Sequence, residues 1–161
     1  MTYENPYINS STWTELNILE TLRKRNPLII CITNDVVRTF TANGLLAIGA
    51  SPVMSECSED LEDLIVHASA LLINIGTVTP DKVTYYKEAI TLAKAHEVPI
   101  VLDPVGCHAG AYRLSVVLDL IKTNAISLLR GNQSEIKAIY DALNINHKID
   151  SSLSGKGVDG E

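Results

Sequence analysis

Short apolar runs alternate with longer amphipathic segments along most of the chain. The apolar runs have about the length of β-strands and cover residues 27–33, 51–54, 70–76, 98–103 and 125–130. Between them, apolar residues recur at helical spacing over residues 35–48, from 58 onwards, and over 79–96, 112–122 and 132–143. Strands that alternate with helices predict parallel βαβ units with right-handed crossovers. We therefore predict an α/β fold of three α/β/α layers with a mostly parallel sheet.

The predicted helices carry recognisable end signals. Gly49 follows the first helix of the repeat, Ser58 is positioned as an N-cap, and Thr79-Pro80 combines a cap with a first-turn proline. Residues 132–135, Asn-Gln-Ser-Glu, form a capping box. The uninterrupted apolar run 27–33 is typical of a strand that is covered on both faces.

The 161 residues fit one ordinary domain with three parts. Residues 1–26 form a largely polar segment with one expected helix, and residues 27–143 contain the βα repeats. From residue 144 to 161 the apolar periodicity disappears and Ser, Asp and Gly dominate, so we expect a polar tail there.

Composition narrows the classes of partner. The formal net charge of −6 argues against a nucleic-acid or anionic-membrane partner, because both require a basic surface. The apolar stretches are too short to span a bilayer. Cys31, Cys57 and Cys107 form no CxxC pair, and we interpret them as reduced, mostly buried thiols of a cytoplasmic protein.

Polar or adaptable residues stand where the predicted strands end. In an open parallel sheet, ligands bind beyond the carboxyl ends of the strands. These ends carry Thr33-Asn34, Met54, Gly76-Thr77, Asp103 and Arg130. One such group per strand, all on one edge, indicates a ligand cleft.

Asp103 is the most informative of these residues. Pro104 cannot donate to the sheet, so the strand must stop there and leave the carboxylate at the edge. An ionised Asp in this place suits Mg²⁺, which binds one or two carboxylates together with substrate phosphates. It equally suits a residue that only caps a neighbouring turn, a common role of strand-end aspartates.

The other strand-end residues also have two interpretations each. Arg130, followed by Gly131, fits a phosphate contact or a surface salt bridge. Glu135 is explained by the capping box alone, and Asn34 could simply cap the helix that follows it. Met54 by itself is more typical of core packing.

Taken together, the motifs resemble those of hydroxyethylthiazole kinases. The resemblance runs in order from about Pro27 to Asp159 and rests on Cys31-Ile32-Thr33-Asn34, residues 40–47 (Phe-Thr-Ala-Asn-Gly-Leu-Leu-Ala), residues 49–54 (Gly-Ala-Ser-Pro-Val-Met), Asn74-Ile75-Gly76-Thr77, residues 102–106 (Leu-Asp-Pro-Val-Gly), Arg130-Gly131-Asn132 with Glu135, and Lys156-Gly157-Val158-Asp159. Each tetrapeptide is weak evidence alone, whereas their joint occurrence in this order is specific.

This resemblance implies a ribokinase-like fold and transfer of the γ-phosphate of ATP to the hydroxyl of 4-methyl-5-(2-hydroxyethyl)thiazole, a step of thiamine biosynthesis and salvage. It implies Mg²⁺ as cofactor and a homotrimer with thiazole sites between subunits. Carried over by motif, Met54, Asn34 and Gly76 would bind the thiazole alcohol. Asp103 and Glu135 would hold or orient Mg²⁺, and Arg130 would contact the ATP phosphates.

The resemblance also implies a comparable length of chain after the Lys156–Asp159 motif, with a Gly-rich helix start that carries the catalytic residue. No such turn follows Arg130 in this sequence. We therefore expect a partial ribokinase-like domain without its catalytic residue and with negligible kinase activity of its own. Two alternatives remain: an inactive remnant that acts as a ligand-binding or subunit-interaction module, and a phospho-acceptor signalling domain. The second would need an acidic cluster at Thr33-Asn34 and a Lys at Arg130.

Overall fold

The computed structural model describes the backbone of residues 10–154 and the side chains of residues 17–144. Its strands are β1 (Leu28–Ile32), β2 (Ser51–Met54), β3 (Ala70–Asn74), β4 (Ile100–Asp103) and β5 (Ile126–Leu129). Its helices are α1 (Ser10–Arg25), α2 (Arg38–Ile48), α3 (Ser58–Ile65), α4 (Pro80–Ala95), the short 3-10 helix η1 (Cys107–Ala109), α5 (Ala111–Ile121) and α6 (Gln133–Ser154).

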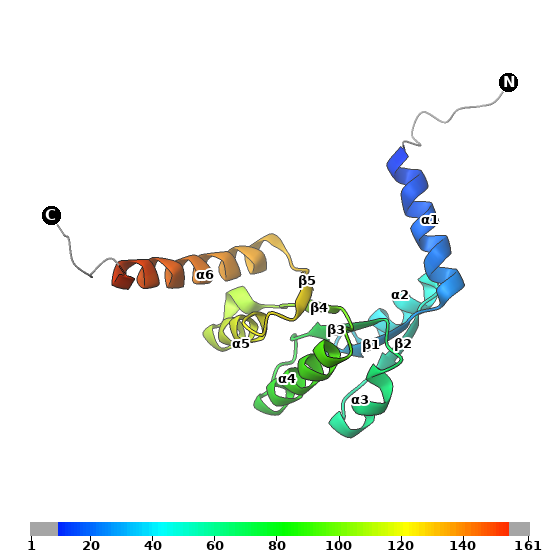
Figure 1. Cartoon of the computed structure of the whole chain (residues 1–161), viewed down its shortest axis with the longest axis horizontal. Helices are drawn as coiled ribbons and strands as arrows, with labels where there is room; N and C mark the ends of the chain where they lie inside the picture. The colour runs from blue at the N-terminus through cyan, green and yellow to red at the C-terminus, as the bar shows by residue number, and fades with distance from the viewer. Residues whose placement is uncertain (1–9, 155–161) are drawn as a thin grey trace.

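The strands form one parallel sheet in the order β2-β1-β3-β4-β5 (Figure 1). A helical segment connects each strand to the next one in the sequence. This arrangement confirms the predicted α/β fold with its parallel sheet. Because all strands are parallel, their carboxyl ends lie along one edge. The residues that follow those ends are therefore brought together.

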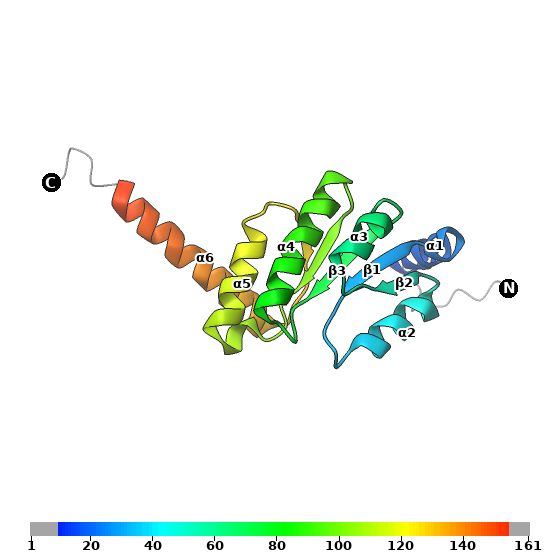
Figure 2. The same cartoon turned by 90° about the horizontal axis from the view of Figure 1, so that it is seen from below.

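One face of the sheet is covered by α3, α4 and α5 (Figure 2). Leu71 and Ile73 of β3 point to this face and are fully buried. They belong to a core that includes Tyr86 of α4 and Val117 and Leu120 of α5. Burial of these apolar side chains is the main favourable contribution to folding of this layer.

In the part of the chain that the structure describes, the opposite face is covered by α2, at the side of the sheet formed by β1 and β2 (Figure 1). Cys31 of β1 is buried there, as expected for a strand with both faces covered. Further along this face, Leu72 and Val101 are half-buried, and Leu128 of β5 is 56% exposed. Two-sided burial was thus predicted correctly for β1, whereas β5 is covered on one face.

Several helix ends differ from the predicted ones. Helix α2 begins at Arg38, not Asp35, because Asn34 turns the chain before the helix starts. The N-cap of α3 is Cys57, and Ser58 is its first helical residue. Helix α6 continues to Ser154, beyond the expected end near residue 143. No Gly or Pro interrupts residues 133–154, so the backbone stays helical after the apolar periodicity stops.

Other predicted end signals are confirmed. Gly49 ends α2 in the left-handed conformation with φ 98°. Thr79 caps α4 by accepting from the backbone N–H of Lys82. A further end signal, which was not predicted, is the basic tripeptide Arg23-Lys24-Arg25 at the end of α1, where positive charge complements the carbonyl end of the helix. Within residues 10–154, no helix combines the length and the apolar character needed to cross a membrane.

Candidate functional site

A chain of side-chain hydrogen bonds joins the carboxyl ends of the strands. The Asn34 side-chain amide donates to Oδ1 of Asn74 at 2.8 Å, and Nδ2 of Asn74 donates to Oδ2 of Asp103 at 2.9 Å. Nη1 of Arg130 donates to the same Asp103 oxygen at 3.0 Å. These residues follow or end β1, β3, β4 and β5, so the chain crosses most of the sheet edge. Three of the predicted site residues are thereby brought together through Asn74.

The same residues line one cavity of about 750 Å³, between α2 and the ends of β3, β4 and β5. Its wall contains Asn34, Asn74, Asp103, Arg130 and Glu135 together with apolar side chains of α2. The mixture of an apolar wall and a few converging polar groups is typical of a small-molecule site. Four of the six predicted site residues lie in this wall.

Gly76 and Met54 take other positions. The backbone N–H of Gly76 donates to Oδ1 of Asn74 at 2.9 Å, so Gly76 stabilises the hydrogen-bond chain through its backbone. A Cβ at Gly76 would lie 2.5 Å from Nδ2 of Asn34, which leaves no room for a side chain. Met54 is half-buried at the end of β2, paired with Cys31 of β1. Over the described residues, Met54 is not among the side chains that line the cavity.

Asp103 is buried, and its environment acts on its ionisation in opposite directions. Desolvation is the largest influence and raises the pKa of Asp103 above its usual value. The nearby Arg130 guanidinium lowers this pKa, and the Glu135 carboxylate raises it. Because Oδ2 accepts from both Asn74 and Arg130, Oδ1 is the oxygen left for a ligand. A carboxylate held in this way is suited to an electrostatic role.

Glu135 links two loops at the same edge. Its Oε2 accepts from the backbone N–H of Asn132 at 2.9 Å, and the Glu135 N–H donates to the Asn132 side chain, which confirms the capping box. Its Oε1 accepts from the Gly106 N–H at 2.8 Å. Glu135 is thus buried, and each of its carboxylate oxygens accepts one backbone N–H, from one loop each.

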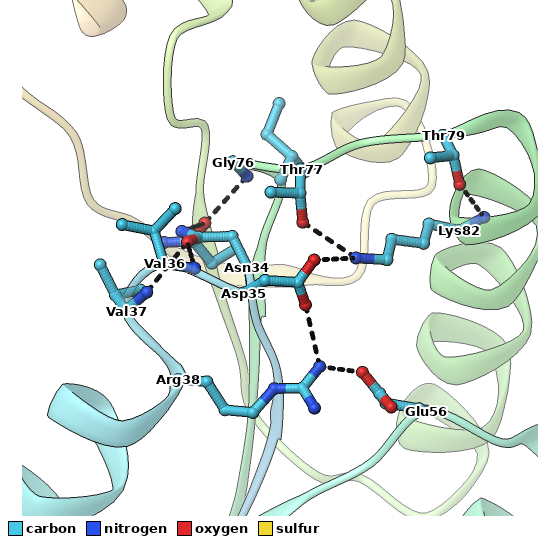
Figure 3. Close-up of polar contacts among 12 residues, drawn as sticks. Asn34, Asp35, Val36, Val37, Arg38, Glu56, Gly76, Thr77, Thr79 and Lys82 are labelled. Carbon is cyan, nitrogen blue, oxygen red and sulfur yellow. Dashed lines mark hydrogen bonds and ion pairs between the residues drawn. The ribbon is translucent and has the colours of Figure 1, made fainter.

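Asn34 does not cap α2, whose N-cap is Val37, but its side chain shapes the turn that precedes the helix. Its Oδ1 accepts from the backbone N–H groups of Val36 and Val37 at 2.9 and 3.1 Å, which forms the turn before α2 (Figure 3). Its Nδ2 is thereby left to donate to Asn74. The turn fixes the orientation of the amide, so the turn before α2 and the hydrogen-bond chain of the site depend on the same side chain.

Charged residues connect the loops after β1, β2 and β3 on the outer side of the site (Figure 3). Arg38 pairs with Asp35 at 3.1 Å and with Glu56. Lys82 donates to Thr77 at 2.9 Å and lies 3.9 Å from Asp35. Asp35 and Glu56 are exposed, and Arg38 and Lys82 are partly exposed. Solvent therefore screens the pairs, and each contributes little to stability.

A second cavity, of about 700 Å³, lies between α3 and α4. Its wall consists of helix residues, among them Glu62, Lys87 and Leu92. It contains none of the strand-end groups that could position a substrate or a metal. We therefore assign the site to the cavity at the sheet edge.

Sequence reasoning missed Asn74 and Arg113. Asn74 lies inside a matched motif, but within an apolar run it was interpreted only as part of a strand. Arg113 of α5 donates to the backbone carbonyls of Ile75, Gly76 and Val105. Asn74 could have been predicted as a site residue, because a polar residue at the end of an apolar strand is unusual. The sequence around Arg113 contains no pattern that predicts its contacts.

The sequence is similar to that of proteins from one known enzyme family. A model of the Hydroxyethylthiazole kinase family matches residues 19–159. A hydroxyethylthiazole kinase of Streptococcus agalactiae serotype Ia is 57% identical over 142 residues, 88% of this chain and 52% of the relative. One from Streptococcus suis is 55% identical over 88% of this chain and 51% of the relative. The chain thus spans about half the length of these curated relatives.

The solved structure of a hydroxyethylthiazole kinase protein from Pyrococcus horikoshii OT3 has the same fold over the matched region. It superimposes with a TM-score of 0.79 at 39% sequence identity, covering 85% of this chain and 54% of the other. The matched family region contains all the residues of the hydrogen-bond chain from Asn34 to Arg130. The chain belongs to the hydroxyethylthiazole kinase family.

Proposed function

We propose that the cavity at the sheet edge is the substrate and nucleotide cleft of a kinase that transfers the γ-phosphate of ATP to the hydroxyl of 4-methyl-5-(2-hydroxyethyl)thiazole. The observation that carries this proposal is the hydrogen-bond chain from Asn34 to Arg130 along one cavity wall. Phosphoryl transfer requires mainly positioning and electrostatic stabilisation, and this wall offers a neutral amide end and a charged end.

The charged end is suited to phosphates and Mg²⁺. Among the described side chains, those of residues 17–144, no group of three or more His, Cys, Asp or Glu is arranged to hold a metal by itself. Mg²⁺ bound with substrate phosphates requires only one or two protein carboxylates, which Asp103 and Glu135 provide. The residues therefore fit a metal that arrives with the nucleotide. When bound, Mg²⁺ neutralises phosphate charge.

Asp103 and Glu135 differ in this proposed role. Oδ1 of Asp103 is free to contact the metal or a water bound to it, because Oδ2 holds both hydrogen bonds. Glu135 already accepts two backbone N–H groups, so we assign it to orienting metal-bound water. The Arg130 side chain is 75% exposed, which leaves most of its donors available to phosphate oxygens.

The neutral end is the proposed thiazole pocket. Asn34 lies in the cavity wall there, and the apolar wall of α2 suits the ring. Gly76 lies outside this wall and is a proposed thiazole contact on the family motif. Met54 remains a proposed thiazole contact, on the family motif. We assign no residue of this chain to the group that faces the reacting hydroxyl, and we propose the family's homotrimer and a cytoplasmic location for the whole protein.

Calorimetry with the purified chain tests this proposal. The thiazole alcohol and Mg²⁺ with ATP are titrated separately into wild type and into Asp103→Asn. Asparagine keeps an acceptor for Asn74 and Arg130, so the wall persists while the carboxylate charge is lost. We expect the variant to bind Mg²⁺ with ATP at least about tenfold more weakly, with unchanged affinity for the alcohol.

Phosphorylated product is followed in the same samples by ³¹P NMR. Binding of both ligands supports the proposed cleft, and product formation adds the kinase reaction. Binding of the alcohol without product favours a ligand-binding module. If wild type binds neither ligand, the proposed function is wrong.

A further inference from the structure

The guanidinium of Arg113, on α5, donates hydrogen bonds to two loops of the site. Nη1 donates to the carbonyl oxygens of Ile75 at 3.2 Å and Val105 at 3.1 Å, and Nη2 donates to that of Gly76 at 2.9 Å. Ile75 and Gly76 follow β3, whereas Val105 follows β4. A single side chain on α5 therefore holds the loops after two neighbouring strands.

The position of Arg113 is unfavourable for the helix that carries it. Arg113 lies in the first turn of α5, where the positive end of the helix dipole opposes a cation. The side chain is also half-buried and loses part of its hydration. Hydrogen bonds from a charged donor to three carbonyls offset these costs. Arg113 therefore stabilises the two loops and not α5.

Both loops carry proposed ligand-binding groups. The Gly76 N–H anchors Asn74, and Asn74 in turn contacts Asn34 and Asp103. The loop after β4 contains Pro104 to Gly106, and the Gly106 N–H anchors Glu135. The separation of these loops therefore sets the separation of the neutral and charged ends of the cavity.

We propose that Arg113 is a positioning residue that sets the spacing between the thiazole end and the phosphate end of the cleft. This inference rests on the proposed function for what the two ends bind, but not for the loop contacts. A lysine cannot replace the arginine fully, because a single ammonium lacks the planar fork that reaches carbonyls of both loops at once. Arg113 acts through the loops and contacts no substrate itself.

Amide hydrogen exchange tests the loop contacts independently of catalysis. Arg113→Met and Arg113→Lys are compared with wild type, and Lys122→Met is the control for loss of a cation from the exposed end of the same helix. In Arg113→Met we expect exchange of the Gly76 and Gly106 amides to rise at least about tenfold, while core amides of β3 and β4 keep their rates. Arg113→Lys should fall between the two, and Lys122→Met should match wild type.

Ligand affinity is the second measurement on the same proteins. Arg113→Met should lower the affinity for the thiazole alcohol and also the affinity for Mg²⁺ with ATP. If Arg113 acted on one end of the cleft only, the substitution would lower the affinity for one of these ligands. Unchanged loop exchange in Arg113→Met, or an equal rise throughout the core, overturns the positioning role. Failure of wild type to bind either ligand would instead overturn the proposed function, and the exchange result distinguishes the two failures.

Discussion

Asn74 and Asp103 occupy paired positions on the neighbouring strands β3 and β4, and their side chains are joined by a 2.9 Å hydrogen bond from Nδ2 to Oδ2. The other side of the Asn74 amide accepts from Asn34 and from the Gly76 backbone. Only one amide orientation satisfies all three contacts, because the reverse would place the NH₂ group against two donors. The amide therefore fixes which Asp103 oxygen remains for a ligand.

Replacing Asn74 with leucine keeps the approximate size of the side chain and removes all three contacts. We expect the free energy of unfolding to fall by about 1–3 kcal/mol, because buried donors of Asn34 and Gly76 lose their acceptor. Urea denaturation monitored by circular dichroism measures the change. Asn17→Leu, at an exposed position of α1, is the control and should leave the midpoint nearly unchanged. Equal midpoints for Asn74→Leu and wild type would show that the hydrogen-bond chain contributes nothing to stability.

Replacing Gly76 with alanine introduces a methyl group where the structure has no space. The new Cβ would lie 2.5 Å from Nδ2 and 2.9 Å from Cβ of Asn34, so the turn before α2 must shift. We expect a loss of about 1–3 kcal/mol in stability, the usual cost of overpacking, together with weaker binding of the thiazole alcohol.

The control for this substitution is Gly110→Ala. Gly110 has an extended backbone with φ −159°, and a Cβ there would meet nothing within 4 Å. Thermal denaturation and calorimetry on both variants separate steric crowding at Gly76 from a general effect of glycine replacement. A Gly76→Ala protein as stable as Gly110→Ala would contradict the close packing described here.

The substitution Glu135→Gln tests whether both carboxylate oxygens of Glu135 are needed as hydrogen-bond acceptors. Its carboxylate accepts from Gly106 through one oxygen and from Asn132 through the other. Glutamine has a single carbonyl oxygen, so one backbone N–H must face an NH₂ group. We expect about 1–3 kcal/mol of destabilisation in urea, compared with no significant change for Glu62→Gln, which alters an exposed carboxylate on α3. Equal stability of the two variants would refute this account of Glu135.

Much of the fold was predictable because the signals are local. The bounds of β2 were predicted without error, and the other strands differ at their ends only, since the apolar runs coincide with the strands. The cap at Thr79 and the capping box from Asn132 were predicted because each depends on residues within one helical turn. Strand ends on a parallel sheet meet at one edge, which placed Asp103 and Arg130 together.

The missed features depend on long-range geometry. The role of Asn74 follows from the pairing of β3 with β4, and register cannot be derived from either strand alone. Arg113 binds carbonyls 37 and 38 residues away along the chain, and backbone acceptors leave no trace in a sequence. The exposure of Leu128 likewise depends on which elements cover the sheet.

The three cysteines should react with a thiol reagent at different rates. Cys57 is exposed, whereas Cys31 and Cys107 are buried, so the prediction of buried thiols is confirmed for Cys31 and Cys107 and wrong for Cys57. Burial raises the pKa of Cys31 to about 11. It also raises the pKa of Cys107, with a further contribution from the Glu135 charge. The thiolate is the reactive form, so at pH 8 Cys31 is almost entirely protonated as well as covered. The raised pKa of Cys107 also favours its protonated form, and its side chain is covered too.

With Ellman's reagent at pH 8, we therefore expect one fast thiol and two slow ones in the native protein, and all three fast in guanidinium chloride. Cys57→Ser should abolish the fast phase and leave the slow reactions unchanged. Raising the pH toward 11 increases the thiolate fraction of Cys31, but burial still limits access of the reagent. Two or more fast thiols in the folded wild type would mean that the sheet face under α2, or the loop at η1, opens far more readily than this packing allows.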